Sequence, residues 1–146
     1  MSYSNILISI DGSECSMNAM KKGIELATAL SANVIVLSVV DMTSMVDNAA
    51  VGAIIDKDVE VVYQEEAENI VNSALKKYPY AKTTLIEEEG IPKEAINSIA
   101  EKYKVDMIIM GTHGRTGLKH LFMGSVAEYV IRHSKIPVMV VTTTED

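Results

Sequence analysis

Four short runs of the sequence are apolar at almost every position and do not alternate with polar residues. They cover residues 6–10, 34–40, 107–110 and 138–141. Continuous runs rich in β-branched residues are typical of strands covered on both faces, as in parallel sheets. A fifth run, residues 83–89, ends in three glutamates, and this more polar composition predicts a strand at the edge of the sheet.

The segments between these runs carry apolar residues at three- and four-residue steps, which predicts four amphipathic helices. The stripes run from Met17 to Leu30, from Val59 through Val62 to Leu75, from Ile96 to Tyr103, and over residues 125–133. In the last helix, Val126, Val130 and Ile131 are expected to face the sheet. The third helix is expected to begin at Pro92, because proline is tolerated in a first helical turn.

The alternation of strands and helices predicts the fold class. Five strands separated by helices favour an open, mainly parallel α/β sheet with helices on both faces. A chain of 146 residues predicts a single domain, residues 1–146. The only long connection, residues 41–56, is predicted to be a flexible flap.

Composition narrows the classes of function. The formal net charge of −7 argues against a nucleic-acid partner, which calls for clustered Lys and Arg. Cys15 is the only cysteine and has no partner for an internal disulfide, which favours a reducing compartment. The first apolar run is too short for a signal peptide, and no stretch approaches the ~20 apolar residues that span a bilayer. A soluble, cytoplasmic protein without a membrane partner is expected.

The segment from Gly111 to Gly117, Gly-Thr-His-Gly-Arg-Thr-Gly, carries the most chemical information. It follows a predicted buried strand, and Gly124-Ser125 then opens a predicted helix. Glycine lets a backbone turn sharply and approach a ligand closely, and a helix N-terminus favours an anion. Residues 111–127 contain no Asp or Glu but include His113 and Arg115. The segment therefore predicts a site for a phosphate-bearing ligand.

A second unusual turn, Asp11-Gly12-Ser13, follows the first strand. Ligands of open α/β sheets bind beyond the carboxyl ends of the strands, where the strand order reverses. If the first and fourth strands are neighbours there, both turns face one crevice. Asp11 can then accept hydrogen bonds from a ribose hydroxyl or a base amino group while the glycine loop holds phosphates. This arrangement predicts a nucleotide lying across the sheet.

The same residues also suit simpler structural roles. The glycines fit plain turn geometry, Asp11 and Ser125 fit helix capping, and Arg115 fits a solvated loop charge. A Walker A loop needs a lysine that is absent here, and a dinucleotide fingerprint needs three glycines after the first strand. The spacing of the three histidines does not suit zinc, and Cys15 without a second nearby cysteine suits packing better than nucleophilic chemistry.

The pattern Gly-x-x-Gly, nine residues, then Gly-Ser is met by Gly111, Gly114, Gly124 and Ser125. Together with the N-terminal Ile-Leu-Ile-Ser-Ile-Asp-Gly-Ser and the closing Ile-Pro-Val-Met-Val-Val, it resembles the ATP-binding branch of the universal stress protein family. The resemblance runs essentially end to end. It implies a flavodoxin-like sheet of strand order 3-2-1-4-5, and a homodimeric stress-response protein. The implied ligand is ATP, or else AMP or another adenine nucleotide, with Mg²⁺ or Mn²⁺ on the phosphates.

The resemblance also implies roles for single residues. Asp11 would contact the adenosine moiety, and Val39 would hold the adenine through its main chain. The phosphates would be surrounded by Gly111, Gly114, Gly124 and Ser125, with Val126 donating its amide. The predicted site also includes His113, Arg115 and Gly117 of the same loop.

The last strand, Val138–Val141, should lie at a sheet edge although it is wholly apolar. Apolar edges invite pairing, and in the family the last strand commonly pairs with its counterpart, which predicts a homodimer through this strand. Three functions stay open: a nucleotide-dependent regulator, a slow ATP-hydrolysing or phosphate-transferring enzyme, and a scaffold dimer without nucleotide. Hydrolysis needs a group that positions a water molecule and usually a metal ion. Asp11 and the histidines are available, but no spacing assigns any of them to that role.

Overall fold

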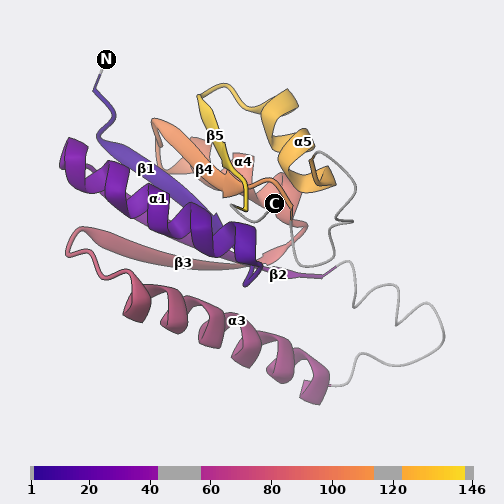
Figure 1. The fold of residues 1–146 in the computed structure, drawn as a ribbon. Coiled ribbons are helices and arrows are strands. Elements are labelled where there is room, and N and C mark those ends of the chain that lie inside the picture. The colour runs from indigo at the N-terminus through magenta and orange to yellow at the C-terminus, as the bar shows by residue number, and fades with distance from the viewer. Residues whose placement is uncertain (1, 43–56, 114–122, 144–146) are drawn as a thin grey trace.

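The computed structural model of the protein describes residues 2–42, 57–113 and 123–143. Strands and helices alternate along the chain (Figure 1), as the sequence predicts. In chain order the elements are β1 (Asn5–Ile10), α1 (Glu14–Leu30), β2 (Asn33–Asp41), α3 (Lys57–Lys77), β3 (Thr83–Gly90), α4 (Pro92–Lys102), β4 (Met107–Gly111), α5 (Ser125–His133) and β5 (Val138–Val141).

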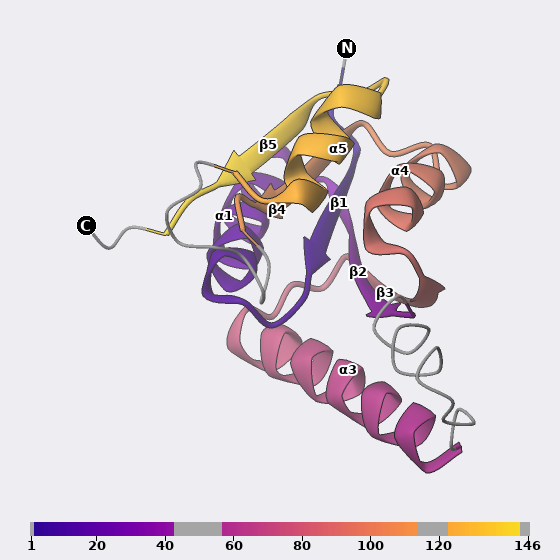
Figure 2. The same cartoon turned by 90° about the vertical axis from the view of Figure 1, so that its right-hand side faces the viewer.

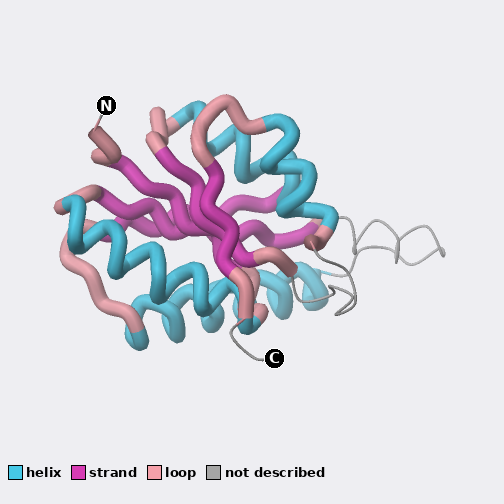
Figure 3. Tube along the Cα trace, turned by 45° about the horizontal axis from the view of Figure 1, so that its top comes forward, coloured by secondary structure: helices cyan, strands magenta, loops and turns pink. Residues whose placement is uncertain are grey.

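The five strands form one parallel sheet in the order β3-β2-β1-β4-β5. Figure 3 shows the twist of this sheet. This confirms the predicted fold class and strand order. The central strand β1 pairs with β2 on one side and with β4 on the other. The strand order therefore reverses between β1 and β4, where the two unusual turns begin.

Helices cover both faces of the sheet (Figure 2). On one face, α1 and α3 pack against alternate residues of β1 such as Ile6 and Ile8, which are fully buried. On the other face, α4 and α5 pack against Leu7 and its neighbours in β2 and β4. Because successive strand residues point to opposite faces, a strand between two helical layers must be apolar at every position, which explains the continuous runs.

Among the residues whose burial the structure describes, the predicted helical stripes are wrong at four positions. Ile131 of α5 is 42% exposed, whereas Ala127 and Val130 are buried. Successive helix residues lie about 100° apart, so Ile131 falls on the flank of the face centred on Ala127 and Val130. The other three exposed residues of the predicted stripes are Leu30 at the end of α1, Val62 in α3 and Tyr103, the C-cap of α4.

Two further sequence predictions concern segments outside the strands. Pro92 is the first residue of α4, as predicted. The proposed flap lies almost entirely at residues 43–56, outside the described residues. Within the described part of the chain, no helix is both long enough and apolar enough to cross a membrane.

Candidate functional site

The turns after β1 and β4 meet at the carboxyl end of the sheet. Ser13 Oγ in the first turn donates a hydrogen bond to the main-chain oxygen of His113 in the second, at 3.3 Å. Beneath this contact, Cys15 Sγ and Thr112 Oγ1 lie 3.6 Å apart. The prediction that the two turns face one crevice rested on β1 and β4 being neighbours, and they are.

The first turn is held by local hydrogen bonds. Gly12 has a φ of +84°, a left-handed conformation that glycine adopts without strain. The carboxylate of Asp11 accepts a hydrogen bond from the Ser13 amide through Oδ1, at 2.9 Å. Ser13, not Asp11, caps α1, because its Oγ accepts from the Ser16 amide at 3.1 Å. Asp11 therefore shapes the turn that precedes α1. Asp11 itself is half-buried.

The second turn starts from unusually close packing. A Cβ on Gly111, the last residue of β4, would lie 2.6 Å from Cys15 Cβ and 2.8 Å from the Cys15 carbonyl carbon. Gly111 thus has a packing role against α1 that is independent of any ligand. The next residue, Thr112, is buried, and its Oγ1 lies 3.1 Å from His113 Nδ1.

The chain returns to β4 at the start of α5. The Gly124 amide donates to the main-chain oxygen of Thr112 at 2.6 Å, so the start of α5 lies beside the end of β4. Gly124 is the N-cap of α5, with φ −72° and ψ 161°, and no side chain caps this helix. Ser125 is the first helical residue and is exposed, so it does not act as the cap. The first turn of α5, which includes Val126, therefore presents its amides beside the Thr112–His113 turn.

Val39 lies level with Asp11 on the neighbouring strand. β1 pairs with β2 only as far as Ile10 opposite Ser38, whereas β2 continues beside β3 to Asp41 opposite Gly90. Among the described residues, the main chain of β2 beyond Ser38 therefore has no strand beside it on the β1 side. Val39 and Asp11 are the first residues past the last β1–β2 pair, so they border the same opening.

The structure thus brings together the two turns, Val39 and the start of α5. The predicted site residues Gly114, Arg115 and Gly117 lie outside the described residues. Sequence reasoning missed Ser16 and Thr112. The Ser16 hydroxyl holds the first turn through Asp11 and Ser13, and the Thr112 hydroxyl contacts Cys15 of α1 from the second turn. The signal was present, because small hydroxyl residues flank both turns. Among the described residues, no group of three His, Cys, Asp or Glu side chains is arranged to hold a metal ion.

A doubly wound parallel sheet of strand order 3-2-1-4-5, with two turns and a helix N-terminus at its switch point, defines an open, flavodoxin-like α/β fold. The family model described as "Universal stress protein family" matches residues 2–142. The chain belongs to the universal stress protein family.

Individual relatives agree with this assignment. Universal stress protein MJ0531 of Methanocaldococcus jannaschii is 37% identical over 141 residues, which cover 95% of this chain and 82% of the relative. MJ0577 of the same organism is 36% identical over 153 residues, covering 95% and 94%. A solved structure of MJ0577 matches with a TM-score of 0.86 at 34% identity over the whole of both chains. A universal stress protein solved in complex with cAMP matches with a TM-score of 0.65 at 23% identity, covering 99% and 100%. That last likeness is one of fold.

Proposed function

We propose that this universal stress protein binds an adenine nucleotide, ATP in the first place, and acts as a cytoplasmic homodimer whose state depends on the nucleotide. The observation that carries the proposal is the junction of the β1 and β4 turns through Ser13 Oγ and the His113 oxygen. This junction brings the Asp11 carboxylate, the edge of β2 beyond Ser38 and the start of α5 to the point where the strand order reverses. The solved family member in complex with cAMP supports the adenine nucleotide as the ligand class.

The charges around the site indicate which part of the nucleotide lies next to which residues. The carboxylate of Asp11 repels phosphate, so it suits a ribose hydroxyl or a base amino group, and Val39 offers its main chain to the adenine. The start of α5, at Gly124, Ser125 and Val126, offers amides and a positive helix end to the phosphates. We place Gly111, His113, Gly114, Arg115 and Gly117 in the same phosphate loop.

A divalent ion, Mg²⁺ or Mn²⁺, fits this site only if the nucleotide itself supplies ligands to the ion. Mg²⁺ usually keeps several waters and binds through one or two carboxylates together with substrate phosphates. Because the described residues contain no group of three His, Cys, Asp or Glu side chains that could hold a metal ion, the ion would be held by the nucleotide's phosphates and by water. Its contribution would be to neutralise phosphate charge.

The test begins with the purified protein. Denaturation should release an adenine nucleotide that mass spectrometry identifies. In a melting scan, ATP–Mg at about a hundred times Kd should stabilise the fold by roughly 2.7 kcal/mol, on the order of 5–10 °C in Tm. Gly124→Val, which adds a branched side chain at the start of α5, should melt as a folded protein without this shift. Absence of both released nucleotide and shift would leave a scaffold dimer as the function.

A further inference from the structure

Thr112 is a buried polar residue at the start of the second turn. It follows Gly111, the last residue of β4, and only 5% of its surface is exposed. Its amide donates to the Val141 oxygen at 3.1 Å, and its own main-chain oxygen accepts from the Gly124 amide at 2.6 Å. Because β5 and the start of α5 hold its main chain on both sides, the Thr112 side chain begins from a fixed position.

The Thr112 hydroxyl lies between two side chains that can form hydrogen bonds. Its Oγ1 is 3.6 Å from Cys15 Sγ of α1 and 3.1 Å from Nδ1 of the neighbouring His113. A hydroxyl has a single proton to donate, although its oxygen can accept from other donors. The direction of the two contacts therefore depends on which of the two neighbours is the better acceptor.

The better acceptor is the imidazole. A thiol sulfur accepts hydrogen bonds only weakly, whereas an unprotonated ring nitrogen of histidine is an ordinary acceptor. The Thr112 hydroxyl should therefore donate to His113 Nδ1 and accept from the Cys15 thiol. In this direction all three groups are paired. The reverse direction would place the hydroxyl proton on the weaker acceptor and would remove Thr112 as an acceptor for the Cys15 S–H.

This direction fixes the proton of the His113 ring. A neutral imidazole that accepts at Nδ1 carries its proton on Nε2. Because Nδ1 faces the buried Thr112, Nε2 lies on the side of the ring away from Thr112. The main chain of His113 already lies at the junction of the two turns, where its oxygen accepts from Ser13 Oγ at 3.3 Å. An N–H at this place suits a phosphate oxygen, which can only accept.

We propose that Thr112 is a positioning residue of the nucleotide site. It holds the His113 ring as the Nε2–H tautomer, and this N–H donates to a phosphate oxygen of the nucleotide. Cys15 supports the arrangement from α1 by donating to the Thr112 hydroxyl. The phosphate contact rests on the proposed nucleotide function, whereas the tautomer does not, because it follows from contacts within the protein.

The tautomer can be measured on the wild-type chain without any ligand. In ¹⁵N NMR at alkaline pH, where imidazole is neutral, the protonated and unprotonated ring nitrogens give separate signals. Comparison with His113→Gln assigns the signals of His113, which should show Nε2–H.

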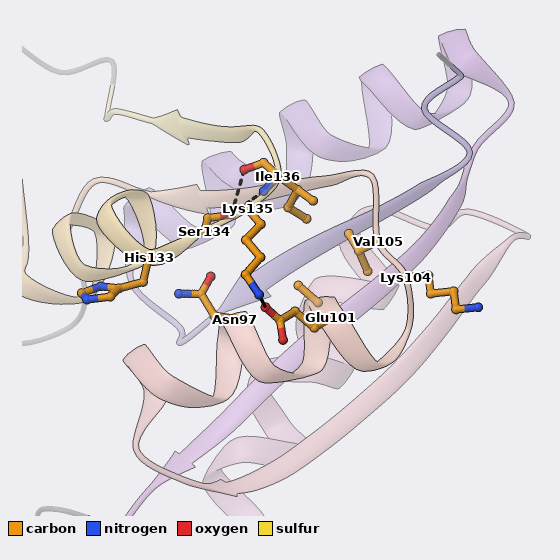
Figure 4. Close-up of a pocket in the computed structure, with 9 residues that line it drawn as sticks. Asn97, Glu101, Lys104, Val105, His133, Ser134, Lys135 and Ile136 are labelled. Atoms are coloured by element: carbon orange, nitrogen blue, oxygen red, sulfur yellow. Dashed lines mark hydrogen bonds and ion pairs between the residues drawn. The ribbon is translucent and has the colours of Figure 1, made fainter.

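His133 provides an internal reference of the opposite kind. Its Nδ1 lies 2.9 Å from the Tyr129 oxygen, and because a carbonyl only accepts, this nitrogen should carry the proton. Figure 4 shows the His133 side chain on α5, among the residues that line a hollow between α4 and α5. The spectrum of one sample should therefore contain both tautomers, one from each histidine.

Variants of Thr112 test whether its hydroxyl sets the tautomer. Thr112→Val keeps the shape of the side chain but removes the hydroxyl, so His113 should show a mixture of both tautomers. Thr112→Ser keeps the hydroxyl and should restore Nε2–H, which a purely structural role of the threonine methyl group would not explain. The matched control is Thr84→Val on the exposed edge strand β3, which should give the wild-type spectrum.

Calorimetry with ATP–Mg and with adenosine tests the phosphate contact. Thr112→Val should weaken ATP binding about tenfold, because hydrogen bonds to charged groups are the stronger ones. Adenosine has no phosphate and should bind the variant as it binds the wild type. Thr112→Ser should restore ATP binding. In a His113→Ala chain, Thr112→Val should cause no further loss, since its effect passes through the histidine.

The possible failures can be told apart. Nδ1–H on His113 in a wild type that binds ATP would overturn the inference alone, because Thr112 would then accept instead of donate. Additive losses in the double variant would also overturn it, since Thr112 would act independently of His113. Nε2–H in a wild type that binds neither ATP nor adenosine would confirm the pairing of Thr112 with His113, but would contradict the phosphate contact and the proposed function together.

Discussion

At the scale of single residues, the hydroxyl of Ser13 joins two parts of the site. It accepts from the Ser16 amide, which caps α1, and it donates to the His113 oxygen one hundred positions away along the chain. From the sequence, Asp11 was the residue of this turn that fitted helix capping, whereas Ser13 is the N-cap in the structure. The second bond is not visible, because it depends on how the sheet brings two distant turns together.

Replacing Ser13 with alanine should therefore affect both the helix and the site. Loss of an N-cap costs about 0.5–2 kcal/mol, and loss of the bond from Ser13 Oγ to the His113 oxygen should loosen the second turn. We expect Ser13→Ala to lower Tm by roughly 2–8 °C and to weaken ATP binding measured by calorimetry. Ser98→Ala, on the exposed face of α4, is the control and should leave both quantities unchanged. Equal melting of the two variants would contradict the role of Ser13.

Asp11 permits a separation of turn structure from ligand contact. Asparagine keeps a side-chain oxygen that can accept from the Ser13 amide, as Asp11 Oδ1 does at 2.9 Å. We expect Asp11→Asn to melt close to the wild type but to bind ATP roughly tenfold or more weakly, because hydrogen bonds to charged groups are the stronger ones. With 2′,3′-dideoxy-ATP the wild type and the variant should bind alike. A loss of the same size with that analogue would move Asp11 from the ribose to the base.

At the scale of elements, the sequence predicted the strands better than the helix faces. Strands buried on both sides need apolar residues throughout, so residues 107–110 could be recognised without knowing their neighbours. Helix faces depend on which neighbours pack against each turn, and the sequence does not show that Leu30 and Tyr103, at the ends of α1 and α4, are exposed. The role of Gly111 could be predicted only in part. A glycine at this position indicated a turn that binds a ligand, whereas the close packing of β4 on α1 became clear only from the structure.

Gly111→Ala tests that packing. Alanine would gain about 0.5–1 kcal/mol from a stiffer unfolded chain, but overpacking costs about 1–3 kcal/mol. The clash should prevail, because the added Cβ would lie 2.8 Å from the Cys15 carbonyl carbon and 3.0 Å from the Ser16 amide nitrogen. These backbone atoms cannot move unless α1 moves. We expect a lower midpoint in urea denaturation, with Lys21→Ala on the exposed face of α1 as the control. A midpoint at or above that of the wild type would show that α1 yields.

At the scale of the whole molecule, the alternating element order was sufficient to predict the sheet, while the strand order came from the family resemblance. The meeting of the two turns followed from that order. The geometry of the opening could not be predicted from that order. It depends on β2 continuing from Val39 past the last residue of β1 that pairs with it. The proposed dimer is also a property of the whole molecule. It rests on the outer edge of β5, the edge that faces away from β4.

The direction of the main-chain groups of β5 can be assigned. The oxygens of Pro137 and Val141 accept from Ile108 and Thr112, so residues 137 and 141 point toward β4. Strand residues alternate in direction, so Met139 also points toward β4, while Val138 and Val140 point away from it. All four residues of β5 are only half-buried. The outer edge thus offers Val138 and Val140 to a second copy of the chain.

A proline at position 140 should break that pairing selectively. Proline removes the outward amide but leaves the β4–β5 ladder intact, and it is tolerated on edge strands when its nitrogen faces away from the sheet. We expect Val140→Pro to shift the protein from dimer to monomer in light scattering coupled to gel filtration. Val140→Ala keeps the amide and should remain dimeric at the same concentration. If the proline variant stays a dimer, the subunits associate through another surface. If the alanine variant also dissociates, side-chain packing and not main-chain pairing holds the two copies together.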